Sequence, residues 1–184
     1  QLRASSATFK LKTSTVDGFH PRHFKCMCDG ALDSLGKCFL LAEVFGSMPT
    51  QLSEVQIPLI EQVVDDSSLP TKRRPIGIFK ATFRLWARAR STIVKSWEQS
   101  TVNQHFFNNA AGKRVGDGVW RTSVRAHSAT AKSQFTLEVQ NDLSSCFETV
   151  DRQMLWDAAV SLGYPLPILR VSLASSAWRR FVSL

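Results

Sequence analysis

Long apolar runs are missing from this sequence, and so are several common signatures of chemistry. No stretch reaches the roughly 18 consecutive apolar residues of a transmembrane helix, so we expect no membrane span. The first residues contain neither an initiator methionine nor an apolar signal core, which indicates a fragment or a processed product. We find no Ser/His/Asp triad and no activated cysteine. The glycines at 112–118 lack the spacing of a phosphate-binding P-loop.

Cysteine is scarce, with four in 184 residues. Their spacing is too irregular for a disulfide framework, which is typical of a reducing, intracellular compartment. Cys26 and Cys28 follow His20 and His23, a grouping that suggests zinc. On a helix, however, residues two apart point about 200° from each other, so both thiols cannot reach one ion. We therefore expect these cysteines to serve packing.

Acidic residues are outnumbered, 15 against 23 lysines and arginines, and the net charge is +8. The 43% hydrophobic content permits a packed core, and 21% charged residues is not a disordered composition. A basic excess of this size suits a polyanionic partner. Nucleic acid is the first candidate and an anionic membrane surface the second.

The positive charge is concentrated between Ser67 and Trp97, where the sequence has no Asp or Glu. The basic residues of this block are Lys72, Arg73, Arg74, Lys80, Arg84, Arg88, Arg90 and Lys95. A solvated helix face usually mixes both signs of charge. A face of one sign with interspersed aromatics is more typical of contact with a phosphate backbone, although a solvated face stays open as the alternative.

Hydrophobic periodicity predicts an α+β fold. The expected elements are a loose, flexible lead-in at 1–16, a turn at Asp17-Gly18, a helix at 23–45, a strand at 55–60, a polar loop at 65–71, helices at 80–97 and 118–132, a strand that alternates from 135 onward and ends at Asp142, a helix from Ser144 or Ser145 to about Leu162, and a last helix from about Pro167. Gly46 and Pro49 should end the first long helix.

The predicted strand at 135–139 leads to Asp142, immediately before a predicted helix. A strand that ends in a carboxylate is a good place to hold a divalent cation. Nucleotidyl transfer needs at least two such carboxylates around two Mg²⁺ ions about 4 Å apart. The pattern alone leaves two interpretations of Asp142, a metal ligand or a helix cap.

The stretch from Asp142 to Asp151 resembles the first catalytic motif of reverse transcriptases of the non-LTR retroelement and group II intron type. The resemblance implies that Asp142 is catalytic and binds Mg²⁺, with Leu143 beside the incoming nucleotide. It also implies that Phe147 is the aromatic gate that excludes a 2′ hydroxyl; a core aromatic is the alternative. Glu148 departs from the family, which usually has Asp there.

The stretch Lys72-Arg73-Arg74-Pro75-Ile76-Gly77-Ile78 resembles the fingers motif of the same family. The resemblance implies that Arg74 holds the triphosphate of the nucleotide. The family often has an Ile-Pro-Lys segment upstream, but Leu59 stands in place of that lysine. Lys72 or Arg73 is the candidate substitute. The residues expected to contact nucleic acid are Arg73, Lys80, Arg84, Arg88, Lys113 and Arg114.

Two shorter segments fit the same order. Asp17-Gly18-Phe19 resembles the Pro-Asp-Gly-Ile segment before the first fingers helix, with Val16 in place of the proline. The loop at Lys113-Arg114 lies where the family has a glycine-rich basic segment near template and nucleotide. It is a template contact or a plain exposed turn.

The resemblance implies a right-hand polymerase fold with fingers at 17–132 and a partial palm at 133–184. It implies an RNA-directed DNA polymerase, whose partners are an RNA template, a DNA primer and deoxynucleoside triphosphates and whose cofactor is Mg²⁺. Only 42 residues follow Asp142, and the family's second catalytic motif, aromatic-x-Asp-Asp, is not among them. We therefore expect the second carboxylate pair and the thumb to lie outside this chain, and the isolated fragment to be inactive.

Three rival functions stay open. The first is a non-catalytic nucleic-acid-binding remnant of a retroelement polymerase. The second is an RNA-dependent RNA polymerase, against which Phe147 argues, because that class usually has Asp at the gate position. The third is a basic helical interaction protein without a nucleic-acid role.

Overall fold

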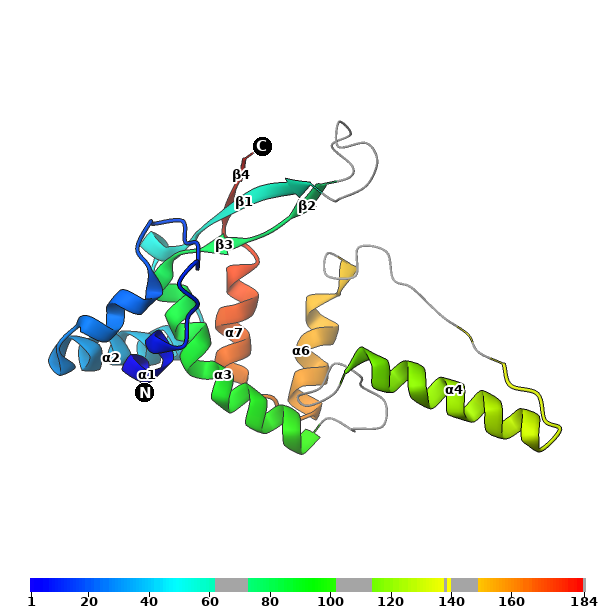
Figure 1. The fold of residues 1–184 in the computed structure, drawn as a ribbon. Helices are drawn as coiled ribbons and strands as arrows, with labels where there is room; N and C mark the ends of the chain where they lie inside the picture. Colours follow the sequence, from blue (N-terminus) through cyan, green and yellow to red (C-terminus); the bar gives the residue numbers. More distant parts are fainter. Residues whose placement is uncertain (62–72, 102–113, 138, 140–148, 184) are drawn as a thin grey trace. The chain divides into compact units, whose positions relative to one another are not determined.

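The computed structural model describes residues 1–61, 73–101, 114–137, 139 and 149–183 (Figure 1). The chain forms two compact units, residues 1–92 with 165–184 and residues 93–164. The first unit combines helices with a small sheet, and the described part of the second is helical. This mixture confirms the predicted α+β class at the level of secondary structure. Within the described ranges, no helix has the length and apolar content to cross a bilayer.

The sheet of the first unit is built around β1 (Glu54–Glu61). Strands β2 (Arg73–Pro75) and β3 (Ile78–Phe79) pair with β1 antiparallel and in one continuous register. The C-terminal strand β4 (Arg179–Ser183) pairs with β1 in parallel. Strand β1 confirms the prediction for residues 55–60, and it pairs with strands from both chain segments that make up the unit (Figure 1).

Helix α3 (Ala81–Thr101) supplies more buried hydrophobic residues to the core of the first unit than any other described element. Its residues Phe83, Leu85 and Trp86 are buried. Phe83 meets Trp178 edge to face, with ring centroids 4.7 Å apart, and Trp178 leads directly into β4. This stacking joins α3 to the strand, and α7 (Leu166–Ser175) adds the fully buried Val171. The predicted helix at 80–97 is confirmed.

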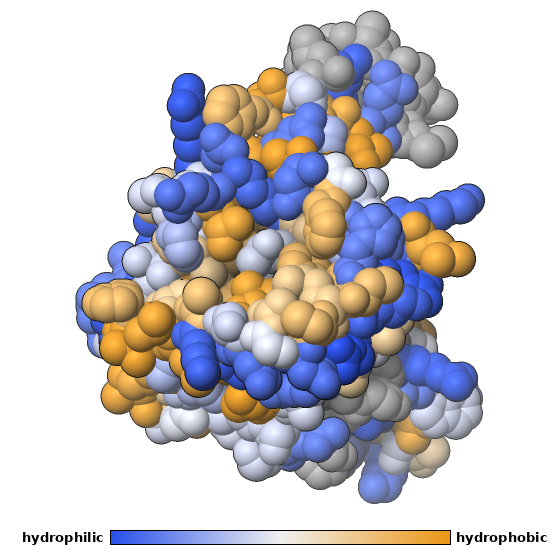
Figure 2. All heavy atoms as spheres, turned by 90° about the vertical axis from the view of Figure 1, so that its left-hand side faces the viewer, coloured by the Kyte–Doolittle hydropathy of each residue, from blue (hydrophilic) through white to orange (hydrophobic). Residues whose placement is uncertain are grey.

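Helix α2 (Asp29–Phe45) begins later than the sequence predicted. Residues 21–26 form a 3₁₀ turn, and Cys28 has extended backbone with ψ of 160°, so the α-helix starts at Asp29. The predicted stop is confirmed, because Gly46 caps the helix with a φ of 74°. Outward apolar side chains interrupt the hydrophilic surface on the α2 side of the molecule (Figure 2); those on α2 are Leu40, Leu41, Val44 and Phe45.

The N-terminal segment contains a helix where the sequence predicted a loose lead-in. Ser6 of helix α1 (Leu2–Ala7) is completely buried. Its hydroxyl is satisfied there, since it donates to the Pro21 carbonyl at 2.7 Å and accepts from the Lys25 amide at 3.1 Å. The side chain of Gln1 donates to the Ala89 carbonyl at 2.9 Å. Long-range polar contacts of this kind produce no apolar periodicity in the sequence, so periodicity could not predict this helix.

The second unit contains the end of α3, α4 (Val115–Ala131) and α6 (Arg152–Ser161). Trp97 donates its indole N–H to the Leu162 carbonyl at 2.8 Å and meets the Tyr164 ring at 4.7 Å. Helix α4 confirms the predicted helix at 118–132. Helix α6 begins at Arg152, where the Asp151 carboxylate accepts the Met154 amide at 2.8 Å as its cap. The predicted helix is therefore interrupted at Val150 and Asp151, and its predicted start at Ser144 or Ser145 lies outside the described residues.

The predicted strand at 135–139 is wrong for the residues that the structure describes. Residues 135–137 and 139 form no strand, and Phe135, Leu137 and Val139 are 103%, 91% and 69% exposed. Alternation of apolar residues marks a segment able to pair, but a strand forms only beside a partner. No described strand pairs with this segment.

Candidate nucleic-acid interface

Arg74 lies on β2 opposite Ile60, and the Pro75 that follows it lies opposite Leu59. The Arg74 side chain is exposed, and no carboxylate in the described part of the chain pairs with it. The hairpin therefore brings the segment that resembles the family's Ile-Pro-Lys directly against the Arg-Pro segment. Leu59, which stands in place of the lysine, is a cross-strand neighbour of the residue after Arg74.

Arg73 points to the opposite face of the hairpin. Its guanidinium lies 3.5 Å from the carboxylate of Glu61, its cross-strand partner. The Nε of Arg73 is buried and has no hydrogen-bond partner among the described residues. Side chains of adjacent strand residues point to opposite faces. Arg73 and Arg74 therefore cannot serve one ligand on one face.

Lys80, between β3 and α3, is held by the protein itself. Its ammonium lies 2.8 Å from the Glu54 carboxylate and donates to the Gln51 carbonyl at 2.6 Å. The hydrogen bond and the charge of Lys80 hold the pKa of Glu54 below its ordinary value. Lys80 has little charge left unpaired for a phosphate.

Arg84 and Arg88 both lie over the buried ring of Phe9, with guanidinium carbons 6.0 and 5.0 Å from its centroid. Arg84 also donates to the backbone carbonyl of Ser14. Burial, and then the nearby charge of Arg88, lowers the pKa of Arg84. Arg88 is the more exposed of the two and is the better placed for an anion.

Arg90, the next cation of the block, forms a mostly buried ion pair with Glu43 of α2. The same carboxylate accepts the indole N–H of Trp86 at 2.7 Å. Glu43 and Glu54 are distant from the basic block in sequence and meet it in space, and Glu61 meets it across the hairpin. The absence of acids between Ser67 and Trp97 therefore does not create a surface of one sign throughout.

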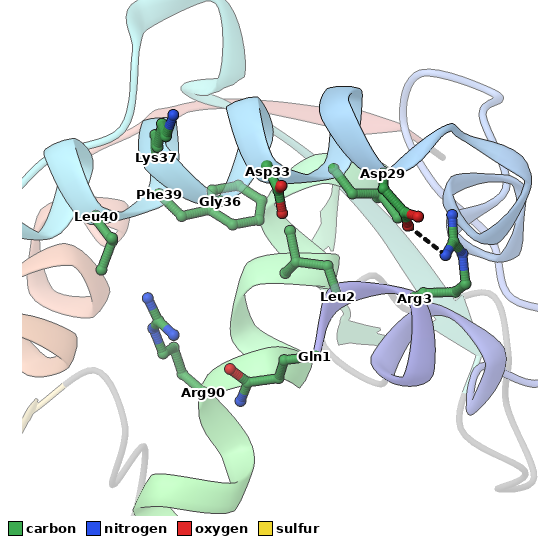
Figure 3. Close-up of a pocket in the computed structure, with 11 residues that line it drawn as sticks. Gln1, Leu2, Arg3, Asp29, Asp33, Gly36, Lys37, Phe39, Leu40 and Arg90 are labelled. Carbon is green, nitrogen blue, oxygen red and sulfur yellow. Dashed lines mark hydrogen bonds and ion pairs between the residues drawn. The ribbon is translucent and has the colours of Figure 1, made fainter.

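A pocket of about 540 Å³ lies between α1, α2 and α3 (Figure 3). Arg3 points to Asp29, and their nitrogen and oxygen are 2.6 Å apart. Asp33, Lys37 and Arg90 contribute further charges of both signs. A lining that alternates cations with carboxylates does not suit a polyanion, so this pocket is not part of the interface.

Asp17 has a role that local sequence reasoning missed. Its two carboxylate oxygens accept the backbone N–H of Ala81 at 3.3 and 3.1 Å, which caps α3 from 64 residues away. The Asp17 carboxylate also accepts the Phe19 N–H at 3.3 Å, and Gly18 has a φ of 67° in the same turn. The segment that resembles the early family motif is thereby joined to the helix that follows the fingers motif.

The remaining predicted site residues divide between the second unit and the undescribed ranges. Arg114 is exposed and immediately precedes α4, where its backbone N–H donates to the Asp117 carboxylate at 2.9 Å. The other residues lie outside the described residues: Lys72, Lys113, Asp142, Leu143 and Phe147. The described residues contain no cluster of three or more metal-ligating side chains. The predicted Mg²⁺ ligand, Asp142, lies outside the described residues.

Comparison with known proteins gives no family assignment. No protein-family model matches the chain, and no curated protein matches it.

Proposed function

We propose that this chain is the fingers and first palm segment of an RNA-directed DNA polymerase of the non-LTR retroelement and group II intron type. The polymerase would add deoxynucleotides to a primer 3′ end on an RNA template. In this proposal Arg74 clamps the triphosphate, Phe147 gates the sugar and Asp142 binds Mg²⁺. When bound, Mg²⁺ would activate the primer hydroxyl and neutralise charge on the triphosphate.

The observation that carries the proposal is the placement of Arg74. Of the three cations at 73–80, Arg73 pairs with Glu61 and Lys80 pairs with Glu54. Arg74 is left exposed on the hairpin without an acidic partner among the described residues. A guanidinium that is positioned by a strand and free of carboxylates is suited to bidentate contact with phosphate.

A second support is the proximity, in the fold, of the segments that resemble the family. Asp17 caps the helix that follows the fingers motif, and Leu59 pairs with Pro75 within that motif. The three segments are spread over some sixty residues of sequence. Unrelated short matches have no reason to adjoin one another in space.

The proposal is tested by calorimetric titration of the chain with a deoxynucleoside triphosphate in the presence of Mg²⁺. Replacing Arg74 by Gln should weaken binding roughly 10- to 100-fold, the range for losing a hydrogen bond to a charged group. Arg73→Gln is the matched control, because it removes the same charge from the opposite face, and it should have much less effect. Equal affinity of wild type and Arg74→Gln would contradict the assignment.

A non-catalytic nucleic-acid-binding remnant of such a polymerase is the second candidate. One observation favours it. The residues before Asp142 should form the strand that positions its carboxylate, but Phe135 and Leu137 are exposed and form no strand. A remnant would bind single-stranded nucleic acid with a strong salt dependence but would not bind the triphosphate through Arg74. The titration above separates the two candidates.

A further inference from the structure

One face of β4 carries an arginine stacked on an exposed aromatic ring. The Arg179 guanidinium lies 4.8 Å from the centroid of Phe181, and the Phe181 side chain is 41% exposed. Residues two apart on a strand point to the same face, so the two side chains form one continuous surface. A flat exposed ring beside a guanidinium offers a stacking surface and a positive charge at one place.

The strand register places this pair on the same sheet face as Arg74. Phe181 lies opposite Gln56, and Arg74 lies opposite Ile60 on the other edge of β1. Gln56 and Ile60 are four residues apart and therefore point to the same face, about 13 Å from each other along the strand. A chain that crosses the sheet obliquely would meet Phe181 and Arg74 in turn.

The charge on this face is positive. Arg179 lies opposite Glu54, but that carboxylate is already bound by Lys80 at 2.8 Å. Arg179 also lowers the pKa of Glu54, so this one carboxylate interacts with two cations. Arg74, which has no acidic partner among the described residues, adds a third, and the face keeps an excess of positive charge. The other neighbour on β4, Val182, is 65% exposed but points to the opposite face, whereas Ile60, 49% exposed, shares the face of Phe181 about 13 Å away along β1.

We propose that Phe181 is a stacking platform for a base of single-stranded nucleic acid, with Arg179 beside it at the phosphate. One flat ring in a basic surface suits a strand whose bases are unstacked and whose backbone is anionic, whereas duplex bases are hidden from such a ring. The inference rests on the proposed function only in sharing nucleic acid as the partner. It requires neither catalysis nor nucleotide binding.

The test is fluorescence anisotropy of the 184-residue chain with short labelled oligouridylate and oligothymidylate. Phe181→Ala should weaken binding roughly 5- to 140-fold, the range for truncating a base-stacking aromatic. Phe181→Leu keeps apolar bulk but removes the flat ring, so it should lose most of the same affinity. Phe181→Trp should retain binding. Circular dichroism melts of each variant check that the fold is intact.

Val182→Ala is the matched control, a neighbouring exposed apolar side chain on the opposite face, and it should change affinity less than about twofold. Arg179→Gln should lower the slope of log affinity against log salt by about 0.7, as expected for one lost contact to a single strand. Phe181→Leu should leave that slope unchanged. Arg180→Gln, on the other face, should also leave it unchanged, because the Arg180 guanidinium donates to the Ser176 carbonyl.

The outcomes separate this inference from the proposed function. If Phe181→Leu and Val182→Ala bind as wild type does, the stacking site is refuted, while triphosphate binding through Arg74 is untouched. If Phe181→Leu loses affinity while Arg74→Gln does not alter triphosphate binding, the stacking site stands and the polymerase assignment fails. A wild-type chain that binds neither oligonucleotide overturns the inference outright.

Discussion

Among the contacts between the N-terminal segment and the core, the Asp17 cap on α3 should be the one whose removal lowers the free energy of unfolding most. The carboxylate accepts the Ala81 N–H, and the Ala81 side chain is fully buried. Asp17→Ala removes the acceptor and leaves that N–H without its partner. Loss of an N-cap costs about 0.5–2 kcal/mol, and the unsatisfied amide places this case at the upper end.

Asp17→Asn distinguishes the hydrogen bond from the charge. An asparagine oxygen caps a helix about as well as an aspartate does. The variant should therefore lose only the interaction of the charge with the helix dipole, about 0.3–1 kcal/mol. Asp33→Ala, on the exposed side of α2, is the matched control and should stay within about 0.5 kcal/mol of wild type.

The assay is urea denaturation, combined with hydrogen exchange at the Ala81 amide. Asp17→Ala should lower the free energy of unfolding by about 2 kcal/mol and accelerate exchange at Ala81. Asp17→Asn should fall between it and wild type. The reasoning is refuted if Asp17→Ala is no less stable than Asp33→Ala, or if protection at Ala81 is unchanged.

Three further predictions concern the ion pairs and catalysis. Glu43→Gln leaves the mostly buried Arg90 without its counter-charge and should lower the free energy of unfolding by roughly 3 kcal/mol in urea melts; a loss below about 0.5 kcal/mol would contradict this. Because Lys80 lowers the pKa of Glu54, that pair stabilises the fold above the ordinary carboxyl value of 4.5 and the stabilisation is lost as the pH falls. The melting temperature of wild type should thus decline on acidification below that value more steeply than that of Glu54→Gln, and parallel curves would refute the pairing. The chain alone should extend no primer on an RNA template, and extension that Asp142→Asn abolishes would overturn the expectation of inactivity.

Local patterns predicted the parts of the fold that depend on neighbouring residues. Periodicity located β1 and α3, and a glycine able to adopt positive φ marked the end of α2 at Gly46. The predicted helix that ends near Leu162 is interrupted at Val150 and Asp151, where Asp151 caps α6 in place of the predicted Ser144 or Ser145. A choice among several capable caps depends on the surrounding backbone and cannot be made from spacing.

Contacts between distant residues account for the rest. The acid-free block suggested a surface of one charge, but Glu43 and Glu54 reach it from other elements. The alternating residues from Phe135 to Val139 suggested a strand, but no described strand pairs with them. The pairing of charges in the first case and the pairing of strands in the second both depend on tertiary structure. Single-sequence reasoning identified the cations of the site but not which of them would remain free.

The central claim is most directly tested by comparing the dissociation constants of dGTP and GTP for this chain in Mg²⁺. If Phe147 is the gate of a DNA polymerase, wild type should bind dGTP more tightly than GTP, and Phe147→Ala should bind the two equally. Phe135→Ala, which removes a fully exposed aromatic from the same unit, should keep the preference. Equal binding of dGTP and GTP by wild type, or a preference that survives in Phe147→Ala, would contradict the account.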